Sequence, residues 1–185
     1  MMKTTIWSKQ HANVAKILNE EGRYISQRGY IIKDLEEHAD LVLEAYDWYV
    51  KKASQSYEKP EDVTYPVWCS FSQEATMLLS ENTVILQLEV DSSLIMPVNI
   101  NKWGIILNYG YIPENMQDEL RHKQLLEDYG TTDAKAYMSL FFPEIKREII
   151  SSWDRLFDDN IIINNDAAYG TLWELKKEWV VKIIQ

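Results

Sequence analysis

The chain has 185 residues, of which 46% are hydrophobic and 26% are charged, and its formal net charge is −10. This composition excludes an intrinsically disordered chain, and the length suits one domain with its own core. The acidic balance argues against general nucleic-acid binding, because affinity for phosphates comes mainly from Lys and Arg. It is more compatible with a basic protein partner.

Cysteine usage and the lack of long apolar runs indicate the compartment. Cys69 is the single cysteine, so an internal disulfide is excluded. Its apolar surroundings are typical of a cysteine that acts as a small buried hydrophobe. Residues 1–9 do not resemble a signal peptide, and no apolar run is long enough to span a membrane. We therefore expect a cytoplasmic protein that does not associate with a membrane.

Two helices are predicted in the first half of the chain. Ser8 is placed to cap the first, and Gly22 is a natural stop signal for it. Asp34 is placed to cap the second, which has the clearer apolar face. The residues at helical spacing are Val14, Ile17 and Leu18 in the first helix, and Leu35, His38, Val42, Ala45 and Tyr49 in the second.

The strongest strand signal lies at residues 83–90, where alternate residues are apolar. Residues 94–98 are expected to return as its neighbour after the turn at residues 91–93. A strand is also predicted at residues 65–71, and a short helix at residues 73–79. Shorter strand patterns lie at residues 4–7 and 30–32.

The second half is predicted to be mainly helical, with closing strands. Helices are expected at residues 101–107, at 113–129, and from Pro143, which suits a first helical turn. The apolar positions of this last helix are Ile145, Ile149, Trp153 and Leu156. The closing strands are expected at residues 172–175 and 179–184. We therefore predict an α+β fold, a single domain over residues 1–185, with a mixed or antiparallel sheet that includes both termini and several packed helices.

Common catalytic motifs are absent. The three histidines are scattered, and none has a cysteine or carboxylate at ligand spacing, so no metal site is predicted. The six glycines form no phosphate-binding loop, and the chain has no nucleophile elbow. The run Arg121, His122 and Lys123 is interpreted as a solvated helix face rather than a basic patch.

Two carboxylates adjoin tryptophans. Asp47 lies between Tyr46 and Trp48, and Glu174 follows Trp173. Aromatic surroundings disfavour the charged form of an unpaired carboxylate, which is a common environment of a functional acid. Alternatively, both carboxylates are exposed and only their aromatic neighbours are buried. The sequence leaves both interpretations open.

Seven phrases, taken in order, carry a family resemblance. They lie at residues 5–7, 46–48, 65–68, 84–90, 103–108, 152–157 and 171–175. Together they resemble a family of bacterial and phage proteins known as domain of unknown function 3841, over essentially the whole chain. Relatives are expected to carry an acidic residue before Trp103 and a histidine after it, where this chain has Val98, Asn99 and Gly104. The resemblance therefore leaves open whether the chain is an enzyme.

A second resemblance concerns the order of elements. An opening strand, a helix ending at Gly22, a Trp-bearing strand and a strongly apolar strand are similar to those of small ADP-ribosyltransferase-like domains. This likeness implies that NAD binds in an aromatic cleft, and that a late carboxylate stabilises the ribosyl cation. Glu174 is the implied catalytic acid, and Tyr46, Trp68 and Ser70 are the implied ligand-binding residues. From the pairing of aromatics with carboxylates and amides, we add Asp47 as a second carboxylate of the site and Trp48, Trp103 and Asn108 as ligand-binding residues.

Two rival hypotheses remain. In one, the chain is a non-catalytic protein, of phage or mobile-element origin, whose acidic surface binds a basic protein partner. Such a surface would use acidic residues such as Glu114, Asp118 and Glu119. In the other, all seven tryptophans belong to the core. Between these extremes, we assign Trp48, Trp68 and Trp103 to a cleft, and assign to the core Trp7, Trp153, Trp173 and Trp179.

Overall fold

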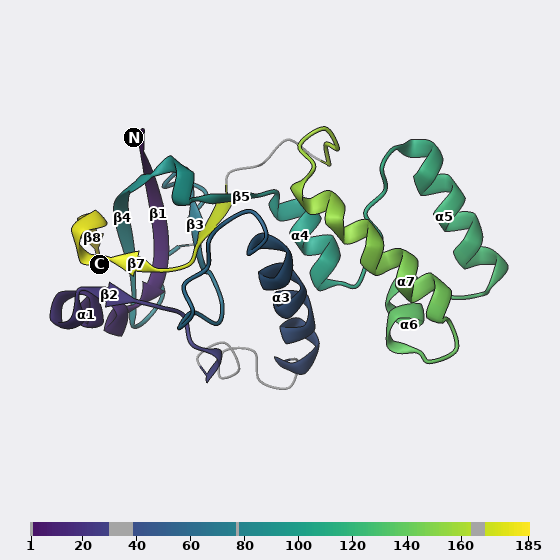
Figure 1. Cartoon of the computed structure of the whole chain (residues 1–185), viewed down its shortest axis with the longest axis horizontal. Helices are drawn as coiled ribbons and strands as arrows, with labels where there is room; N and C mark the ends of the chain where they lie inside the picture. The colour runs from purple at the N-terminus through teal and green to yellow at the C-terminus, as the bar shows by residue number, and fades with distance from the viewer. Residues whose placement is uncertain (1, 30–38, 77, 164–168) are drawn as a thin grey trace. The chain divides into compact units, whose positions relative to one another are not determined.

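The computed structural model describes residues 2–29, 39–76, 78–163 and 169–185. Its backbone divides into two compact units (Figure 1). Unit 1 comprises Met1–Val98 and Ala167–Gln185, and unit 2 comprises Asn99–Asp166. The predicted single domain over residues 1–185 stays a prediction.

A six-stranded antiparallel sheet forms the framework of unit 1, in the order β5-β6-β3-β1-β4-β8. Strands near both ends of the chain belong to it, because β1 and β8 pair with the two sides of β4. The predicted α+β fold with both termini in one sheet is therefore confirmed. The strands are β1 (Lys3–His11), β3 (Val67–Ser70), β4 (Thr83–Asp91), β5 (Met96–Val98), β6 (Tyr169–Leu172) and β8 (Val180–Ile184).

Unit 2 is an insertion between neighbouring strands. β5 ends at Val98 and β6 begins at Tyr169, and these two residues are paired across the sheet. The whole of unit 2 therefore occupies the connection between two hydrogen-bonded strands. A separate two-stranded sheet in unit 1 pairs β2 (Arg23–Tyr24) with β7 (Leu175–Lys176).

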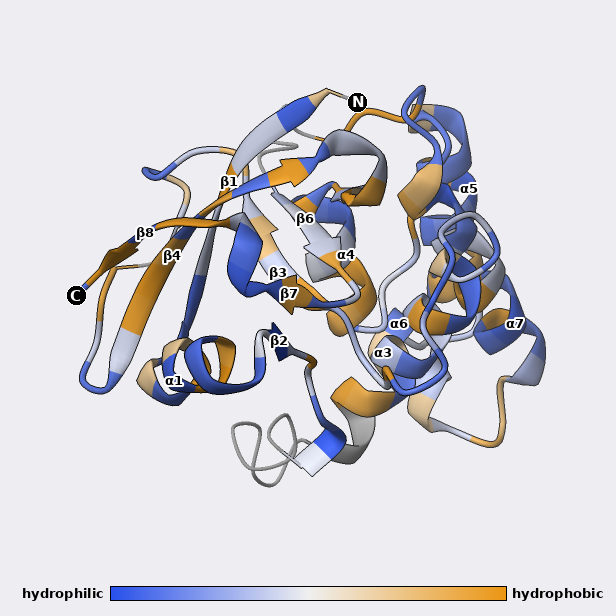
Figure 2. Cartoon of the chain, turned by 60° about the vertical axis from the view of Figure 1, so that its left-hand side comes forward, coloured by the Kyte–Doolittle hydropathy of each residue, from blue (hydrophilic) through white to orange (hydrophobic). Residues whose placement is uncertain are grey.

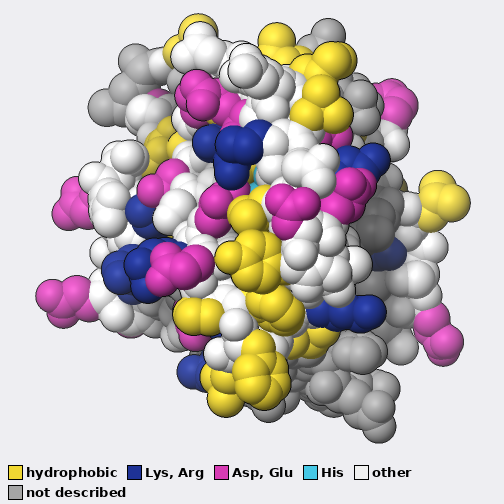
Figure 3. Space-filling model, turned by 90° about the vertical axis from the view of Figure 1, so that its right-hand side faces the viewer, with side chains coloured by type: hydrophobic (Ala, Val, Ile, Leu, Met, Phe, Trp, Pro, Cys, Tyr) yellow, Lys and Arg dark blue, Asp and Glu magenta, His cyan; other side chains and the backbone are white. Residues whose placement is uncertain are grey.

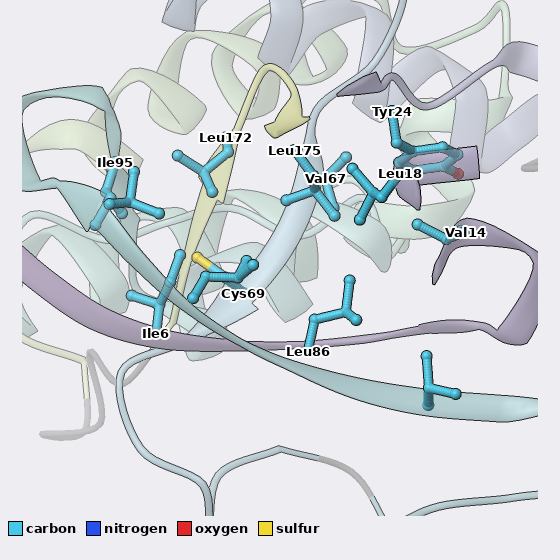
Figure 4. Close-up of a cluster of buried hydrophobic side chains, with 13 residues drawn as sticks. Ile6, Val14, Leu18, Tyr24, Val67, Cys69, Leu86, Ile95, Leu172 and Leu175 are labelled. Carbon is cyan, nitrogen blue, oxygen red and sulfur yellow. The ribbon is translucent and has the colours of Figure 1, made fainter. Parts of the chain in front are cut away.

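A core cluster of unit 1 lies on one face of the sheet (Figure 4). The alternating apolar residues of β4 confirm the predicted strand, and Figure 2 shows that β4 and β8 are the more hydrophobic strands. Helix α1 (Ala12–Glu21) contributes Val14 and Leu18 to this core. Cys69 is also buried there, and burial raises the pKa of its thiol to about 12, so the thiol stays protonated at neutral pH. The β4 side chains in the core are Val84, Leu86, Leu88 and Val90.

The start of α1 differs from the prediction. Ser8 belongs to β1, where its buried hydroxyl donates to the backbone oxygen of Trp68 at 2.7 Å. The N-cap is instead His11, whose Nδ1 accepts from the backbone N–H of Asn13 at 3.2 Å. Strand pairing overrides the local signal, because β1 pairs with β4 over nine residues. The predicted stop is confirmed: Gly22 caps the helix with a φ of 77°.

Helix α3 (Ala39–Ala53) covers the other face of the sheet, where the Tyr49 hydroxyl lies 2.7 Å from the Thr171 hydroxyl of β6. The buried residues Ala45 and Tyr49 fit the predicted apolar face. Other parts of this prediction lie outside the described residues, namely the strand at residues 30–32, the Asp34 cap, and Leu35 and His38.

Three sequence predictions were wrong. Residues 73–76 form a turn rather than the start of a helix, closed by a hydrogen bond from the Thr76 N–H to the Gln73 backbone oxygen at 3.1 Å. β5 pairs with β6 and not with β4, so residues 94–98 do not return as the neighbour of residues 83–90. The predicted strand at residues 172–175 divides between β6 and β7, which lie in different sheets.

Unit 2 is helical. The predicted helices are present, although α5 starts after an Asn115 cap, later than expected, and α6 was not predicted. Pro143 lies in the first turn of α7 as expected, and the four predicted apolar positions of that region are all buried. The helices are α4 (Ile100–Leu107), α5 (Met116–Asp128), α6 (Asp133–Met138) and α7 (Pro143–Ser152), the last continuing as a 3-10 turn at Trp153–Phe157.

The packing around Gly170 in β6 gives a stability prediction. A Cβ atom at Gly170 would lie 2.9 Å from Ile95 Cγ2 and 3.1 Å from the Met96 backbone oxygen. We expect Gly170→Ala to lower the free energy of unfolding by about 1–3 kcal/mol through overpacking. Gly104→Ala is the control, because nothing lies within 4 Å of a Cβ at this helical position. Urea unfolding of both variants checks this, and a Gly170→Ala protein as stable as the parent would contradict it.

Candidate functional site

The sheet face opposite the core carries three of the side chains considered in the sequence. Trp7 of β1 is paired with Ser70 of β3, so both side chains point to the same face. Trp68 lies two residues before Ser70 in β3 and therefore shares that face. Trp7 and Trp68 are each half-buried, and Ser70 is buried. These residues form what we call the Trp7 face: Trp7, Trp68 and Ser70.

An aromatic cluster from α3 and the 65–68 segment adjoins the Trp7 face. The Trp68 indole N–H donates to the Tyr46 hydroxyl at 2.8 Å, and Tyr49 stacks on Trp68 with ring centroids 6.5 Å apart. Tyr46 meets Tyr65 edge-on at 5.7 Å. Burial raises the pKa of the Tyr46 hydroxyl, which is therefore neutral at physiological pH.

Asp47 joins this cluster through Tyr65. The Tyr65 hydroxyl donates to Asp47 Oδ1 at 2.6 Å. Burial, followed by this hydrogen bond, raises the Tyr65 pKa to about 12. The structure thus brings together three predicted site residues, Tyr46, Asp47 and Trp68, and Tyr65 is the link that sequence reasoning missed. Trp48 is half-buried on α3.

The hydroxyl of Ser70 lies in a small polar cluster. It is 2.6 Å from the Thr76 hydroxyl and donates to the Ser72 backbone oxygen at 2.9 Å. Tyr169 is paired with Ser70 across β3 and β6, and its hydroxyl donates to the Ala75 backbone oxygen at 2.7 Å. The turn at residues 72–76 is thereby fastened beside the Trp7 face.

The indole nitrogen of Trp7 is a buried hydrogen-bond donor without an acceptor. Among the described residues, its Nε1 is the buried side-chain nitrogen or oxygen that has no hydrogen-bond partner. Leaving a buried donor unpaired costs about 1–3 kcal/mol, so such groups are rare in folded proteins. The neighbouring Trp68 differs, because its indole N–H is bound by Tyr46.

Glu174 lies in an ion-pair group beside the two-stranded sheet. Arg23 of β2 binds Glu174 Oε2 and also pairs with Asp62 at 2.5 Å. The other oxygen of Glu174 lies 3.1 Å from Lys176 Nζ. Both carboxylate oxygens are therefore engaged, and this arrangement stabilises the β2–β7 pairing whether or not Glu174 also acts in catalysis.

Two further predicted site residues lie in unit 2. Trp103 is 3% exposed and belongs to the interior of this unit. Asn108 ends α4, and its side-chain amide donates to the Gly104 backbone oxygen at 2.7 Å. Both are accounted for locally, as a packed indole and a helix cap, and their ligand-binding role stays a prediction.

The tryptophans are not uniformly buried. Trp103, Trp153 and Trp173 are at most 6% exposed, so the assignment of the latter two to the core is confirmed. Four other tryptophans are half-buried, so the hypothesis that every tryptophan is core stays a prediction. These four are Trp7, Trp48, Trp68 and Trp179.

Unit 2 contains a charged network that sequence reasoning missed. His122 is 4% exposed, so the solvated face predicted for residues 121–123 is wrong at this position. Its Nδ1 lies 2.7 Å from Glu148 and its Nε2 lies 2.7 Å from Asp133. Tyr111 stacks on the imidazole with ring centroids 3.9 Å apart, and Arg121 binds Glu148 at 2.8 Å. These partners come from four segments, and no local sequence signal joins them.

Metal binding is not indicated by the part of the chain that the structure describes. No group of three or more His, Cys, Asp or Glu side chains there is arranged to hold a metal ion.

A family model identifies the relatives of the chain. The model for "Domain of unknown function (DUF3841)" matches residues 5–181, which is nearly the whole sequence. The chain belongs to this family. The DUF3841 match confirms the resemblance expected from the seven sequence phrases. Comparisons with curated proteins and with solved structures give no match.

None of the helices within the described ranges is long and apolar enough to cross a bilayer.

The His122 network gives a prediction about pH. Burial by itself lowers the pKa of the imidazole, but the hydrogen bonds to Asp133 and Glu148 outweigh it, so the His122 pKa is raised. Its stabilising contribution is therefore fully present below the unfolded pKa of about 6.5 and is lost as pH rises through the folded pKa. The Glu148 pKa is lowered by Arg121 and His122, although burial opposes this, so its contribution is lost only in acid.

We expect His122→Gln to lower the free energy of unfolding by at least about 2 kcal/mol at about pH 5.5, because two carboxylates lose a buried cationic partner. This difference should shrink as the pH is raised into the alkaline range. Urea unfolding of parent and variant at a series of pH values checks both statements. A difference that stays constant across the series would show that His122 contributes by packing alone.

Proposed function

We propose that unit 1 binds a nucleotide-like ligand at the Trp7 face, and that NAD is the first ligand to test. The observation that carries this proposal is the buried Trp7 indole N–H without a partner, on the same sheet face as Trp68 and the hydroxyl of Ser70. A ligand atom that accepts from Trp7 Nε1 would remove the free-energy cost of that unpaired donor. Binding would then stabilise the folded protein more than an added surface contact does.

The chemistry of nicotinamide suits these groups. A planar heteroaromatic ring can stack on a half-buried indole, and a carboxamide can accept from Trp7 and donate to a hydroxyl such as that of Ser70. Tyr46 supplies a further neutral hydroxyl at the edge of the Trp7 face, where it already accepts from Trp68. The same groups would suit other flat amide-bearing bases, which the ligand series below distinguishes.

The order of elements gives a second, weaker support. The likeness to ADP-ribosyltransferase-like domains was drawn from an opening strand, a helix ending at Gly22, a Trp-bearing strand and an apolar strand. The corresponding elements are β1, α1, β3 and β4, and the three strands lie side by side in one sheet. The proposed reaction would break the bond between nicotinamide and the ribose of NAD, and an acceptor nucleophile would take the ADP-ribosyl group.

Two carboxylates compete for the catalytic role. Asp47 is connected to the Trp7 face by the contacts of Tyr65, Tyr46 and Trp68. Glu174 is the acid that the resemblance implies, but both of its oxygens are engaged by Arg23 and Lys176. A role for Glu174 therefore requires one of these cations to move or to bind the ligand itself. Mutation can separate these alternatives.

The Trp7 N–H gives the first test. Trp7→Phe removes the unpaired donor, so we expect the ligand-free protein to unfold at the same or a higher temperature, in contrast to an ordinary large-to-small change. The same variant should bind NAD at least about tenfold more weakly, because the hydrogen bond is lost. Thermal shift and calorimetry with NAD, ADP-ribose and nicotinamide provide the measurements.

Trp68→Phe is the matched control for that test, because it removes an indole N–H that already has a partner in Tyr46. It should lose stability by about 1 kcal/mol even without ligand. The proposal fails if none of the three ligands stabilises the parent protein, or if Trp7→Phe leaves their binding unchanged.

The catalytic acid gives the second test. If NAD binds, transfer of a labelled ADP-ribosyl group should fall about a hundredfold or more in the variant that lacks the catalytic carboxylate, Asp47→Asn or Glu174→Gln. Asp62→Asn is the control for Glu174, because it removes the other carboxylate bound to Arg23. If Asp62→Asn and Glu174→Gln reduce transfer equally, the role of Glu174 is structural. If NAD binds without any transfer by the parent, the function is binding alone.

The rival function is the binding of a basic protein by an acidic surface, and the structure bears on which acidic residues could form that surface. Asp118, one of the acids considered, is occupied within unit 2, where it accepts from the Tyr111 hydroxyl at 2.8 Å and pairs with Arg155 at 2.9 Å. Glu114 and Glu119 are exposed. A partner surface built on all three residues is therefore not supported by these contacts.

A further inference from the structure

Unit 2 carries an apolar groove that the proposed NAD site does not use. The groove lies between α5 and the start of α7 and has a volume of about 540 Å³. Its apolar walls come from the end of α5, from the segment before α7, and from α7 itself. The lining residues are Leu125, Tyr129, Phe141, Phe142, Pro143 and Ile145, with Glu144, Arg147, Glu148 and Ser151 along α7.

The rim of this groove is unusually apolar for an exposed surface. Phe141 is 89% exposed and Leu140 beside it is 96% exposed, and Tyr129 across the groove is 60% exposed. Figure 3 shows a band of hydrophobic side chains on the side of the molecule that carries α5 and α7. Exposed apolar side chains gathered at a groove mark interaction sites more often than scattered ones do.

The groove is also a built feature. Tyr129 and Phe142 meet edge-on with ring centroids 6.3 Å apart, which joins the end of α5 to the segment before α7. Glu148, on the α7 side, is held by His122 and Arg121. Tyr129, Phe142 and Glu148 are therefore held by contacts within unit 2.

The charges around the groove favour a basic occupant. α5 ends on Glu127 and Asp128, and its last turn contains no basic residue. The negative end of the helix dipole adds to these two carboxylates beside Tyr129. Along α7, Glu144 is paired with Arg147 at 3.3 Å and Glu148 with Arg121 at 2.8 Å, so the negative charge beside the groove comes from the end of α5. A second copy of the chain is disfavoured as the occupant, because the net charge is −10.

We propose that the groove between α5 and α7 binds an amphipathic, basic segment of a partner protein. The apolar stripe of that segment would lie between the two helices, and its Lys or Arg side chains would face Glu127 and Asp128. Apolar anchors spaced at i, i+3 or i+4, and i+7 suit a groove that runs along a helix. Glu144 and Ser151 span two turns of α7, or about 10 Å, which matches two to three such anchors. This partner site is independent of NAD binding by unit 1.

The probe is a synthetic helix-forming peptide of about 14 residues, or four turns, with Leu and Phe on one stripe and Lys on its flanks. One comparison peptide carries Glu in place of Lys, and another has the Lys peptide's composition in scrambled order. Binding to the full chain is measured by fluorescence anisotropy at about 50 mM and about 300 mM NaCl, which changes the screening of surface charges. The Lys peptide should bind best and should weaken in high salt.

Phe141→Glu tests the apolar wall. It should weaken binding of the Lys peptide about thirtyfold or more, as expected for an aromatic anchor. Leu78→Glu in unit 1 is the matched control, because Leu78 is 88% exposed and lies outside the groove. Both substitutions are at exposed positions, so the folded structure should be retained, which circular dichroism verifies.

Removal of the acids at the end of α5 tests the charge. The double variant Glu127→Gln and Asp128→Asn should bind the Lys peptide about fivefold more weakly at low salt, with a flatter salt dependence. Its control is Glu20→Gln with Glu21→Gln at the end of α1, which also lacks a basic residue in its last turn. Acidic residues at the end of a helix are therefore not enough to predict peptide binding. Only substitution of the pair beside the groove, Glu127 and Asp128, should weaken binding of the Lys peptide.

The inference is overturned if the Lys peptide does not bind, if the Glu or scrambled peptide binds equally well, or if Phe141→Glu has no effect. It is also overturned if sedimentation shows that the protein forms a dimer which Phe141→Glu dissociates, because the occupant is then a second copy. Thermal shift with NAD on the same proteins distinguishes failure of this inference from failure of the unit 1 proposal. A protein can bind the peptide and not NAD, or the reverse.

Discussion

The antiparallel ladder between β1 and β4 is the constraint on which unit 1 depends. It runs over nine residues without a break, from Lys3 opposite Asp91 to His11 opposite Thr83. Because successive residues of a strand point to opposite faces, this register sends Ile6 into the core and Trp7 to the other face. A slip by one residue would exchange them and place an indole in the core. The side chains of the Trp7 face are therefore set by pairing that extends well beyond them.

The two indoles of the Trp7 face differ in their hydrogen bonding within the described part of the chain. Trp7 and Trp68 both lie on inner strands of the sheet, which fix the face of each indole, so the difference between them comes from what packs against that face. Trp68 meets a helix, and α3 provides a tyrosine hydroxyl at hydrogen-bond distance. One face of one sheet thus contains a satisfied and an unsatisfied indole. That contrast is the observation on which the proposed ligand site depends.

The sequence was sufficient to predict those features that depend on residues of a single strand or helix. The alternation in β4, the Gly22 stop and the apolar face of α7 could all be predicted from the sequence, because each depends on the period of one strand or helix. Predictions failed where a distant partner decides the outcome. The local sequence predicts Ser8 as a helix cap, but its pairing with β4 makes it part of a strand. β5 pairs with β6, which follows in the sequence only after the whole of unit 2.

The candidate site shows the same division. The sequence pointed to Tyr46, Asp47 and Trp68 because of their composition, but their connection runs through Tyr65 and could not be predicted. The histidine network was missed for a related reason. His122 sits on a helix that reads as polar on all sides, and its burial depends on Tyr111, Asp133 and Glu148. Charged residues look solvated in sequence whenever their counter-ions come from other helices.

The attachment of unit 2 has a consequence for how this chain can change. Val98 and Tyr169 are paired across β5 and β6, so the insertion begins and ends within one strand spacing, about 5 Å. In terms of the sheet, the whole helical unit occupies the place of a hairpin loop. Its length and sequence can therefore diverge, or a short turn can replace it, without altering the register of any strand. The six-stranded sheet therefore requires only that the connection leave β5 and return to β6 at neighbouring positions.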